Sequence, residues 1–486
     1  MKKNYKNVQD PLYGQIRLED YIVELVDTPP FQRLRNLRQN ANAIMVYPSA
    51  THTRFEHCIG VYHLSCRMLQ QLHQQIIASN DPDLVLEKLE KAEKLVKIAA
   101  LLHDIGHGPY SHLFEEVLRR LDIKYKESFF SHEQIGSIII DKLLRQFQYT
   151  NEDIEIIQSI IQGKQIQYEP FNKFAFLQEI VSNSICSLDT DKLDYLVRDA
   201  HAVSLPVTVA SERIINNCFL FQNLGKYHIC YGSNIQFEIQ QVFQARYGLH
   251  KLLYQHSKVI AVDQNVLEII LKADQLKIID VQQALSNLSS QQDDWFDLFQ
   301  ELDDNLVNQI QYVARRFNQN KELQASIHRF QSHQIYKNIY RVFVNTNFFN
   351  KTHHQLNDFL DQKINNKSIF VSVREIHFGM KEKNPLSYVA FKKQNCVEVS
   401  KLLQEKIGAD EQNQMIKIYK ETPQLNQPKY FTEYGIFIYA TKSYNHTELK
   451  DIALQCRDAM KQAVDKQEIT ETQTVVIEEL EQFIYE

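Results

Sequence analysis

The stretch HDIGHGPYSH, residues 103–112, decides how this sequence is interpreted. Three histidines and one aspartate fall within these ten residues, directly after the apolar run EKLVKIAALL, residues 93–102, which has helical spacing. An adjacent His-Asp pair at a helix end can present an imidazole nitrogen and a carboxylate oxygen to one divalent cation. The glycines and the proline that follow end the helix and let the backbone approach a ligand closely. The alternative is a helix end that carries surface histidines.

Two segments elsewhere in the chain favour the metal interpretation. Arg54-Phe-Glu-His57 opens an expected helix, and in DTDKLDYLVRD, residues 189–199, Asp191, Tyr195 and Asp199 recur every four residues. Residues with this spacing share one face of a helix. Alone, the histidine would be structural and the acidic face a solvated surface. Beside an HD pair, both become candidates for metal or substrate binding.

Composition limits the classes of function. The chain has 486 residues, enough for two or three lobes, and a formal net charge of −6. This charge argues against nucleic-acid binding by a broadly basic surface, but a locally positive pocket for an anionic substrate remains compatible with it. The seven cysteines form no CxxC pair, so a zinc ribbon is not expected and reduced thiols are. No signal peptide and no apolar run of 18 residues are found, so we expect a cytoplasmic protein without a membrane span.

The pattern along the chain predicts a mainly α fold. Only 12 glycines and 11 prolines interrupt it. We expect a helical core in residues 1–260 and a smaller α+β C-terminal lobe, with an oligomerisation or regulatory role, in 261–486, with a weak break near 260–300. Helices are expected at 55–77, 93–103, 132–147, 151–162, 236–258 and within 173–200. Strands are expected only late, at 367–376, 385–393 and 434–441, and a last helix from Asn445, capped by Glu448.

The order H…HD…D resembles the HD superfamily of phosphohydrolases. Longer motifs are similar to its deoxynucleoside triphosphate (dNTP) triphosphohydrolase branch, over about residues 8–420 and with no SAM domain expected before the core. These motifs are QDPLYGQIRLEDYIVELVDTPPFQRLRNLRQ (9–39), HTRFEHCIGVYHL (52–64), LLHDIGHGPYSHLFE (101–115), DTDKLDYLVRD (189–199), ARYGLHKLLYQHSK (245–258), YKNIYRVF (336–343) and FGMKEKNPLSYVAFKK (378–393).

The resemblance implies an HD-domain core and a metal held by His57, His103, Asp104 and Asp191. Two imidazoles and two carboxylates suit Fe, Mn, Zn or Ni and leave positions for water and phosphate. A magnesium ion is expected with the triphosphate. The implied reaction converts a dNTP to a deoxynucleoside and inorganic triphosphate.

The same resemblance suggests roles for the remaining site residues. We expect His112 to be the general acid, oriented by Glu115 three residues on, which would also raise its pKa. His107 and His132 would contact phosphate. Residues expected to bind substrate are Arg54, Lys192 and Arg246 at the triphosphate, Gln39, Tyr195 and Asp199 near the sugar, and His250 and Tyr254 on the same helix face as Arg246.

Regulation is a further expectation. Asp27, Gln32 and Arg35 match the family segment that reads an activating base, and Lys337, Arg341 and Lys383 keep positive charge where activator phosphates bind. We expect a homo-oligomer, with a tetramer favoured, and a dNTP or GTP activator. Other positions depart from the family, because Gly232 and Asn234 replace two basic residues. The alternative for the segment 27–35 is a structural helix with a basic surface.

Two other functions remain compatible with the sequence. One is another HD phosphohydrolase, a nucleotidase or a single-strand nuclease, and the nuclease should show a positive groove with stacked aromatic side chains. The other is a nucleotide sensor with a degenerate site. The complete ligand set and the presence of His107 and His112 argue against the sensor.

Overall fold

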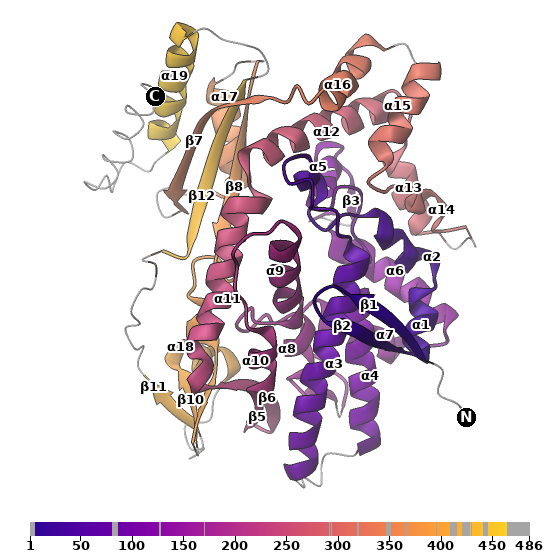
Figure 1. Ribbon diagram of the computed structural model, residues 1–486, viewed down its shortest axis with the longest axis vertical. Helices are drawn as coiled ribbons and strands as arrows, with labels where there is room; N and C mark the ends of the chain where they lie inside the picture. The colour runs from indigo at the N-terminus through magenta and orange to yellow at the C-terminus, as the bar shows by residue number, and fades with distance from the viewer. Residues whose placement is uncertain are drawn as a thin grey trace.

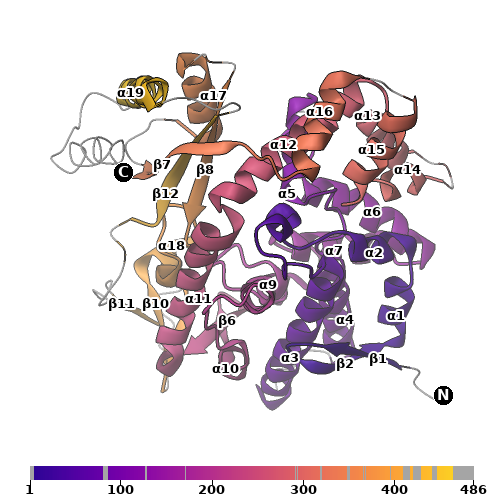
Figure 2. The same ribbon diagram turned by 45° about the horizontal axis from the view of Figure 1, so that its top comes forward.

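The computed structural model describes residues 5–79, 86–125, 128–169, 171–290, 292, 294–317, 320–346, 351–364, 366, 368–394, 396–408, 416–419, 428, 430–440 and 446–463. Helices dominate it, and the sheets are small (Figure 1). A helical core occupies one side of the molecule and a smaller α+β lobe the other (Figure 2). The expected fold class, a mainly α core with a smaller α+β lobe, is therefore confirmed.

The helical core forms where apolar side chains have helical spacing. The first long helix, α3, puts Val61, Leu64, Met68, Leu72 and Ile76 on one buried face. Capping boxes start α6 at Ser131 and α7 at Thr150, because each side chain accepts from the backbone three residues on. The elements are α3 (Arg54–Ser79), α4 (Leu86–Leu102), α5 (His112–Arg120), α6 (His132–Gln146), α7 (Asn151–Ile161), α8 (Leu177–Val181) and α9 (Thr190–Ala202), at the positions predicted for 55–77, 93–103, 132–147, 151–162 and 173–200.

The expectation that strands occur only late is wrong. The chain begins with a hairpin of β1 (Tyr5–Asp10) and β2 (Gly14–Glu19), followed by α1 (Asp20–Val26) and α2 (Pro29–Gln32). A second hairpin joins β5 (Cys218–Asn223) to β6 (Lys226–Gly232). Its turn residues Leu224 and Gly225 both have positive φ, 48° and 73°. Such a two-residue turn is typical of tight hairpins. A further short pair, β3 (Lys124–Tyr125) with β4 (Ser128–Phe129), precedes α6.

The predicted helix 236–258 is shorter than expected. After α10 (Ser211–Asn216), α11 runs over Gln236–Leu249, and a π-helical turn, His250–Tyr254, follows it. The next helix, α12 (Ser257–Gln275), is continuous across the predicted domain boundary at 260/261, and the division into two domains stays a prediction. The expected weak break at 260–300 contains α12 and α13 (Val281–Leu288). Then come α14 (Asp297–Gln300), α15 (Leu306–Phe317) and α16 (Lys321–Gln331).

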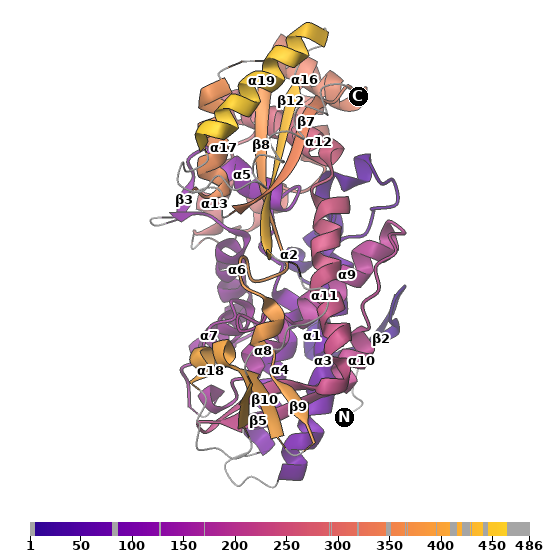
Figure 3. The same cartoon turned by 90° about the vertical axis from the view of Figure 1, so that its left-hand side faces the viewer.

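The C-terminal lobe is built on a three-stranded antiparallel sheet, in the order β7 (Lys337–Asn345), β12 (Thr432–Ala440), β8 (Ile369–His377). Alternate residues of β12 enter different clusters: Ile436 and Ile438 pack with α17 (His353–Ile364) and α19 (His446–Ala463), and Phe437 and Tyr439 pack with α12. Figure 3 shows α17 and α19 beside this sheet. Both faces are buried, which explains the uninterrupted apolar run YGIFIYA.

A second sheet ties the two parts of the chain together. Its order is β11 (Ile416–Tyr419), β10 (Cys396–Ser400), β9 (Phe391–Lys393), β6, β5, and α18 (Lys401–Ile407) packs beside it. The predicted strand at 385–393 is partly wrong, because Pro385–Tyr388 forms a 3-10 helix whose backbone is capped by Asn384. The last helix starts at His446, and the expected cap Asn445 lies outside the described residues. None of the described helices is long and apolar enough to cross a membrane.

Candidate active site

Four side chains from three separate segments converge at the start of α3. His57 lies in the first turn of α3, His103 and Asp104 follow the end of α4, and Asp191 lies in the first turn of α9. The Nε2 atom of His57 is 3.1 Å from Nε2 of His103, 3.1 Å from Oδ1 of Asp191 and 3.6 Å from Oδ2 of Asp104. His103 Nε2 is 3.6 Å from Asp104 Oδ1 and 3.5 Å from Asp191 Oδ1. The structure thus brings together all four residues that the sequence analysis assigned to a metal.

The hydrogen bonds of the two imidazoles test whether a cation fits between them. His57 Nδ1 donates to Oδ2 of Asp194 at 2.8 Å, and His103 Nδ1 donates to the carbonyl oxygen of Ala100 at 2.9 Å. In the neutral rings both Nε2 atoms therefore carry lone pairs, and these face each other at 3.1 Å. Ligands that lie about 2.1 Å from a shared ion are separated by about 3.0–3.4 Å. The donor set fits a divalent transition metal in both chemistry and spacing.

The electrostatics of this group also favour positive charge. Burial would lower the pKa of His57, but Asp191 and Asp194 raise it to about 10. Burial would raise the pKa of Asp104, but the Arg54 guanidinium and three neighbouring histidines hold it well below its usual range. Arg54 Nη1 donates to Oδ2 of Asp104, and Arg54 Nε donates to Ser111 Oγ at 3.0 Å. In the absence of a metal, a proton would take the position that the carboxylates favour for a cation.

A buried network behind His57 was missed by the sequence analysis. Asp194 is fully buried and accepts from Arg198 Nε and Nη2, each at 2.9 Å, and from the Tyr13 hydroxyl at 2.9 Å. Arg198 Nη1 in turn donates to Asp10 Oδ2 at 2.9 Å. Asp10 and Tyr13 belong to the N-terminal hairpin and its turn. A carboxylate that holds the Nδ1 proton of a metal-binding histidine fixes its tautomer and orientation, so this network anchors the hairpin to the metal ligand.

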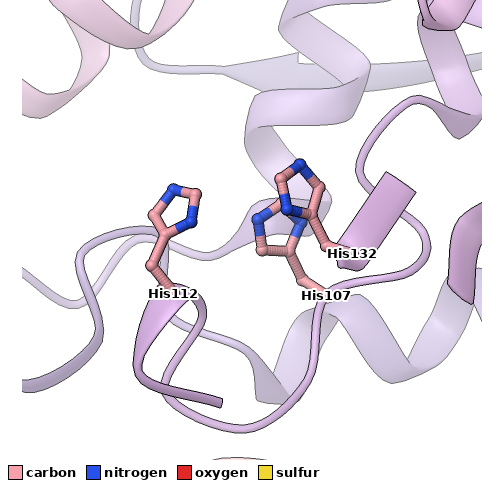
Figure 4. A group of neighbouring side chains, drawn as sticks. All are labelled: His107, His112 and His132. Carbon is pink, nitrogen blue, oxygen red and sulfur yellow. The ribbon is translucent and has the colours of Figure 1, made fainter. Parts of the chain in front are cut away.

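A second group, His107, His112 and His132, lies beside the first (Figure 4). His107 and His132 stack, with ring centroids 4.0 Å apart, and His112 stands edge-on to both at 5.4 and 5.5 Å. Gly106 lets the loop approach α6, since a Cβ there would lie 2.1 Å from the His132 carbonyl oxygen. His107 Nε2 is buried and has no hydrogen-bond partner among the described residues. The group offers imidazole nitrogens to a ligand entering beside the metal centre.

Glu115 is placed differently from our expectation. Although burial and His132 outweigh it, the charge of Glu115 raises the pKa of His112, as predicted. Its Oε1, however, accepts from His132 Nδ1 at 2.6 Å and from the His132 backbone N–H at 3.2 Å, so these hydrogen bonds orient His132 rather than His112. Burial and the neighbouring His132 lower the pKa of His112 to about 4. Burial would raise the pKa of Glu115, but the His132 hydrogen bond lowers it to about 2. Although burial opposes it, Glu115 raises the pKa of His132.

The residues expected at the triphosphate surround the same space. Lys192 Nζ contacts Asp189 Oδ2 at 2.9 Å, and Asp189 also caps α9. Arg246 Nη1 donates to the carbonyl oxygen of His377, at the end of β8. Burial and the Arg246 guanidinium lower the pKa of His377 to about 4. His377 was not singled out by the sequence analysis, because β8 lies far from α11 along the chain.

The residues expected at the sugar form a linked set. Asp199 Oδ1 accepts from His52 Nε2 at 2.7 Å, and Asp199 Oδ2 accepts from the Tyr254 hydroxyl at 2.6 Å. The Tyr195 ring stands between the metal centre and Tyr254, 6.4 Å from the His57 centroid and 6.5 Å from that of Tyr254. His52 was missed, although it lies within HTRFEHC. Two predicted residues hold buried polar atoms without a partner among the described residues, Oε1 of Gln39 and Nδ1 of His250.

The residues expected to bind a regulatory nucleotide fall into two separate places. Asp27 contacts Lys6 Nζ at 3.3 Å, and Gln32 accepts from Arg35 Nε at 2.9 Å, all near α1 and α2. Lys337 and Arg341 are exposed on β7, and Lys383 is exposed in the segment after β8. The α2 region and β7 lie on opposite sides of the molecule (Figures 1 and 2). Within one chain these two sets do not meet.

Comparison with known proteins agrees with this arrangement. Residues 54–198, which contain the four converging side chains, match the HD domain family. The deoxynucleoside triphosphate triphosphohydrolase SAMHD1 homolog of Dictyostelium discoideum is 30% identical over 401 residues, which cover 80% of this chain and 71% of that protein. The SAMHD1 enzymes of Xenopus laevis and Homo sapiens are each 28% identical, over 85% of this chain and 71% and 70% of their own lengths. This chain belongs to the SAMHD1 family of HD-domain deoxynucleoside triphosphate triphosphohydrolases.

Proposed function

We propose that this protein hydrolyses dNTPs to a deoxynucleoside and inorganic triphosphate in a metal-dependent reaction. The observation that carries the proposal is the convergence of His57, His103, Asp104 and Asp191 beside the three-histidine group, with Nε2 of each of the two histidines 3.1–3.6 Å from a ligand atom of each of the other three residues. A centre with four protein ligands leaves positions for water and a phosphate oxygen. The cationic side chains of Lys192 and Arg246 would neutralise the charge of the triphosphate.

The proposed metal is Fe, Mn, Zn or Ni, held by the four ligands named above. Such an ion supplies Lewis acidity at phosphate and lowers the pKa of water, and a magnesium ion is proposed to accompany the triphosphate. Asp194 and the Ala100 carbonyl oxygen would keep both imidazoles in the tautomer that presents Nε2 to the metal. Arg54, which donates to Asp104, would also contact a phosphate oxygen through its guanidinium.

The three-histidine group would manage the proton of the leaving 5′-oxygen. We assign His112 as the general acid because its ring centroid lies 5.4 Å from that of His107, whose Nδ1 is 3.3 Å from Oδ1 of the metal ligand Asp104. Its pKa of about 4 in the free protein means that the negative charge of a bound triphosphate must raise it before it can donate a proton. His132, whose Nδ1 contacts Glu115, would contact phosphate, and His107 would offer its Nε2, which has no hydrogen-bond partner among the described residues.

The sugar side of the site is proposed to select deoxyribose. Tyr195 would pack under the ribose and exclude a 2′-hydroxyl by its bulk. Asp199, held by both His52 and Tyr254, has a fixed carboxylate that can accept from a sugar hydroxyl. Gln39, whose Oε1 is buried without a described partner, would contact the 3′-hydroxyl. His250, on the helix face of Arg246, would line the same side of the pocket.

Nucleotide regulation in a homo-oligomer is the second part of the proposal. Asp27, Gln32 and Arg35 would read an activating base, and Lys337, Arg341 and Lys383 would bind its phosphates, with a dNTP or GTP as activator. The two sets lie on opposite sides of one chain, so one nucleotide can contact both only between subunits (Figure 1). We therefore favour a tetramer, in which such sites recur by symmetry.

A product assay tests the reaction. The purified protein is incubated with each dNTP, NTP and a single-stranded oligonucleotide, with Mn²⁺ or Mg²⁺, and the products are separated. Release of inorganic triphosphate from dNTPs alone supports the proposal. Release of pyrophosphate or phosphate would indicate another HD phosphohydrolase, cleavage of the oligonucleotide a nuclease, and dNTP binding without turnover a sensor. Pairs of nucleotides in the same assay test activation.

The ligand assignment has its own test. Asp104→Ala is expected to abolish both bound metal, measured by elemental analysis, and turnover, while its helical circular dichroism persists. Full metal occupancy in this variant would contradict the proposed coordination. Asp141→Ala, on the exposed face of α6, is a suitable control because that aspartate pairs only with Arg145 at the surface among the described residues.

A further inference from the structure

A cavity lies beside His112. It has a volume of about 390 Å³ and is enclosed by α5, α12, α17 and β8. The volume is within the range of small-molecule sites. His112 forms one edge of the cavity, and no metal ligand contributes to its lining. The site described above meets this space at His112 and at His377.

The donors of this cavity have few partners. Arg374 extends from β8, and its Nε donates to Ser372 Oγ at 3.0 Å, which fixes the plane of the guanidinium. Among the described residues, nothing accepts a hydrogen bond from its two Nη groups. The rings of His353 and His354, in the first turn of α17, lie with their centroids 4.0 Å apart and are tilted by 39°. No hydrogen bond of the His354 ring is found in the described part of the chain, and the start of a helix favours negative charge.

The carboxylates of the cavity, in contrast, all contact donors. Glu116 accepts from both Arg119 and Arg120, at 2.7–2.8 Å, which leaves this group with one net positive charge. Glu375 lies 3.5 Å from His353, and Asp263 accepts from an amide of Asn42 at 2.8 Å. The groups at the wall with unused hydrogen-bonding capacity include the fixed guanidinium of Arg374 and the imidazole of His354, together with the buried acceptor Oε1 of Gln255. This combination suits a ligand rich in acceptors and negative charge.

We propose that this cavity binds a polyphosphate chain, with Arg374 and His354 as its principal contacts. The anion has two possible sources, inorganic triphosphate released from the neighbouring active site or the phosphates of a second nucleotide. The guanidinium would form two parallel hydrogen bonds with phosphate oxygens, as its planar fork allows. Because His112 borders both spaces, an anion held here would oppose the entry of a substrate triphosphate. The site would therefore inhibit turnover when polyphosphate accumulates.

Binding can be measured without turnover, so the test does not depend on the proposed reaction. The metal-containing protein is titrated calorimetrically with sodium tripolyphosphate, then separately with a dNTP and with a deoxynucleoside. For wild type we expect one tripolyphosphate in the active site and a second in the cavity. Arg374→Gln should weaken the second event about tenfold to a hundredfold, because it removes a charge-assisted pair of hydrogen bonds. Arg374→Lys, which keeps the charge but not the fork, should lie between.

Two variants separate the cavity from the active site. Lys192→Gln should weaken the first binding event and leave the second, and Arg316→Gln, an exposed arginine on α15 outside the cavity, should change neither. Comparable thermal unfolding of Arg374→Gln and wild type shows that the fold is intact. A single event that Lys192→Gln weakens and Arg374→Gln does not would overturn the proposal, as would deoxynucleoside binding at this site. A dNTP that binds the cavity more tightly than tripolyphosphate identifies the nucleotide as the source.

Discussion

Replacing Asp194 with asparagine should weaken metal binding although all four proposed metal ligands are kept. Asp194 never reaches the metal position, because its Oδ2 accepts the Nδ1 proton of His57 at 2.8 Å and its remaining contacts go to Arg198 and Tyr13. Asparagine preserves the size of the side chain but removes its negative charge. The ligand His57 then loses the partner that fixes its tautomer and increases its basicity.

The expected magnitude follows from two separate effects. Loss of such a partner lowers metal affinity about 10- to 100-fold, or about 1.4–2.8 kcal/mol. The second effect is a loss of stability. Arg198 is only 2% exposed, and the substitution leaves it with Asp10 as its remaining carboxylate partner. Breaking a buried ion pair costs about 3–5 kcal/mol, and the amide oxygen that remains as an acceptor places the expected loss near the lower end. Domains of ordinary stability, about 5–15 kcal/mol, survive such a loss.

The assay measures both quantities on the same samples. Metal affinity is obtained by competition with a chromophoric chelator, and the free energy of unfolding by denaturant titration of the metal-free protein. Asp153→Asn is the matched control, since that aspartate is also buried and also paired, with Lys91 at 2.7 Å, but it lies on α7 away from the metal. It should lose stability and keep its metal affinity. Metal affinity within twofold of wild type in Asp194→Asn would refute the orienting role.

Two further predictions concern the contacts around the histidines. Gly106→Ala should lower stability by about 1–3 kcal/mol and reduce turnover, because its Cβ would meet the His132 carbonyl oxygen at 2.1 Å and push α6 away. Thermal unfolding and rate assays measure the two effects. Gly248→Ala is the control, because the space around that glycine is open. His377, whose pKa burial and Arg246 lower to about 4, stays neutral in the folded protein while the unfolded chain takes up a proton below about pH 6.5. The free energy of unfolding should therefore fall as the pH is lowered from about 6.5 to 4, by about 1 kcal/mol at pH 5 after allowance for solvent screening. His377→Gln should flatten this part of the stability-against-pH profile. An unchanged profile in denaturant titrations of this variant would exclude the effect.

The helical core could be predicted because its signal is local. Apolar residues recur every three or four positions in α3 and α4, and a helix end marked by glycine needs no information from distant segments. The hairpin β5–β6 has a weaker local signal, the pair Leu224-Gly225 between apolar runs, because this pair lacks the Asn or Asp that typically precedes glycine in such a turn. The 3-10 helix at Pro385–Tyr388 shows the limit of composition, since its aromatic and apolar residues resemble a strand until the proline is considered.

The partners of the site residues could not be predicted in the same way, because each contact joins segments far apart in the chain. Spacing placed Asp191, Tyr195 and Asp199 on one face of α9, and this face does point at the site. Spacing also favoured Glu115 as the partner of His112, yet the glutamate binds His132, which α6 brings in from outside the motif.

The position of Asp194 has a consequence for how the site is held. It is one helical turn from Asp191 toward Arg198, so α9 provides a metal ligand on one turn and the support for another ligand on the next. The same aspartate is bound by Tyr13, and Arg198 by Asp10, which attaches the N-terminal hairpin to the metal centre through buried charges. Strand β1, which ends at Asp10, also carries Lys6. Lys6 contacts Asp27, one of the residues proposed to read a regulatory nucleotide. A shift of this hairpin on nucleotide binding would thus alter the partner of His57 directly, whereas the contacts of His103 would not change. Regulation through this route should therefore change metal affinity together with activity.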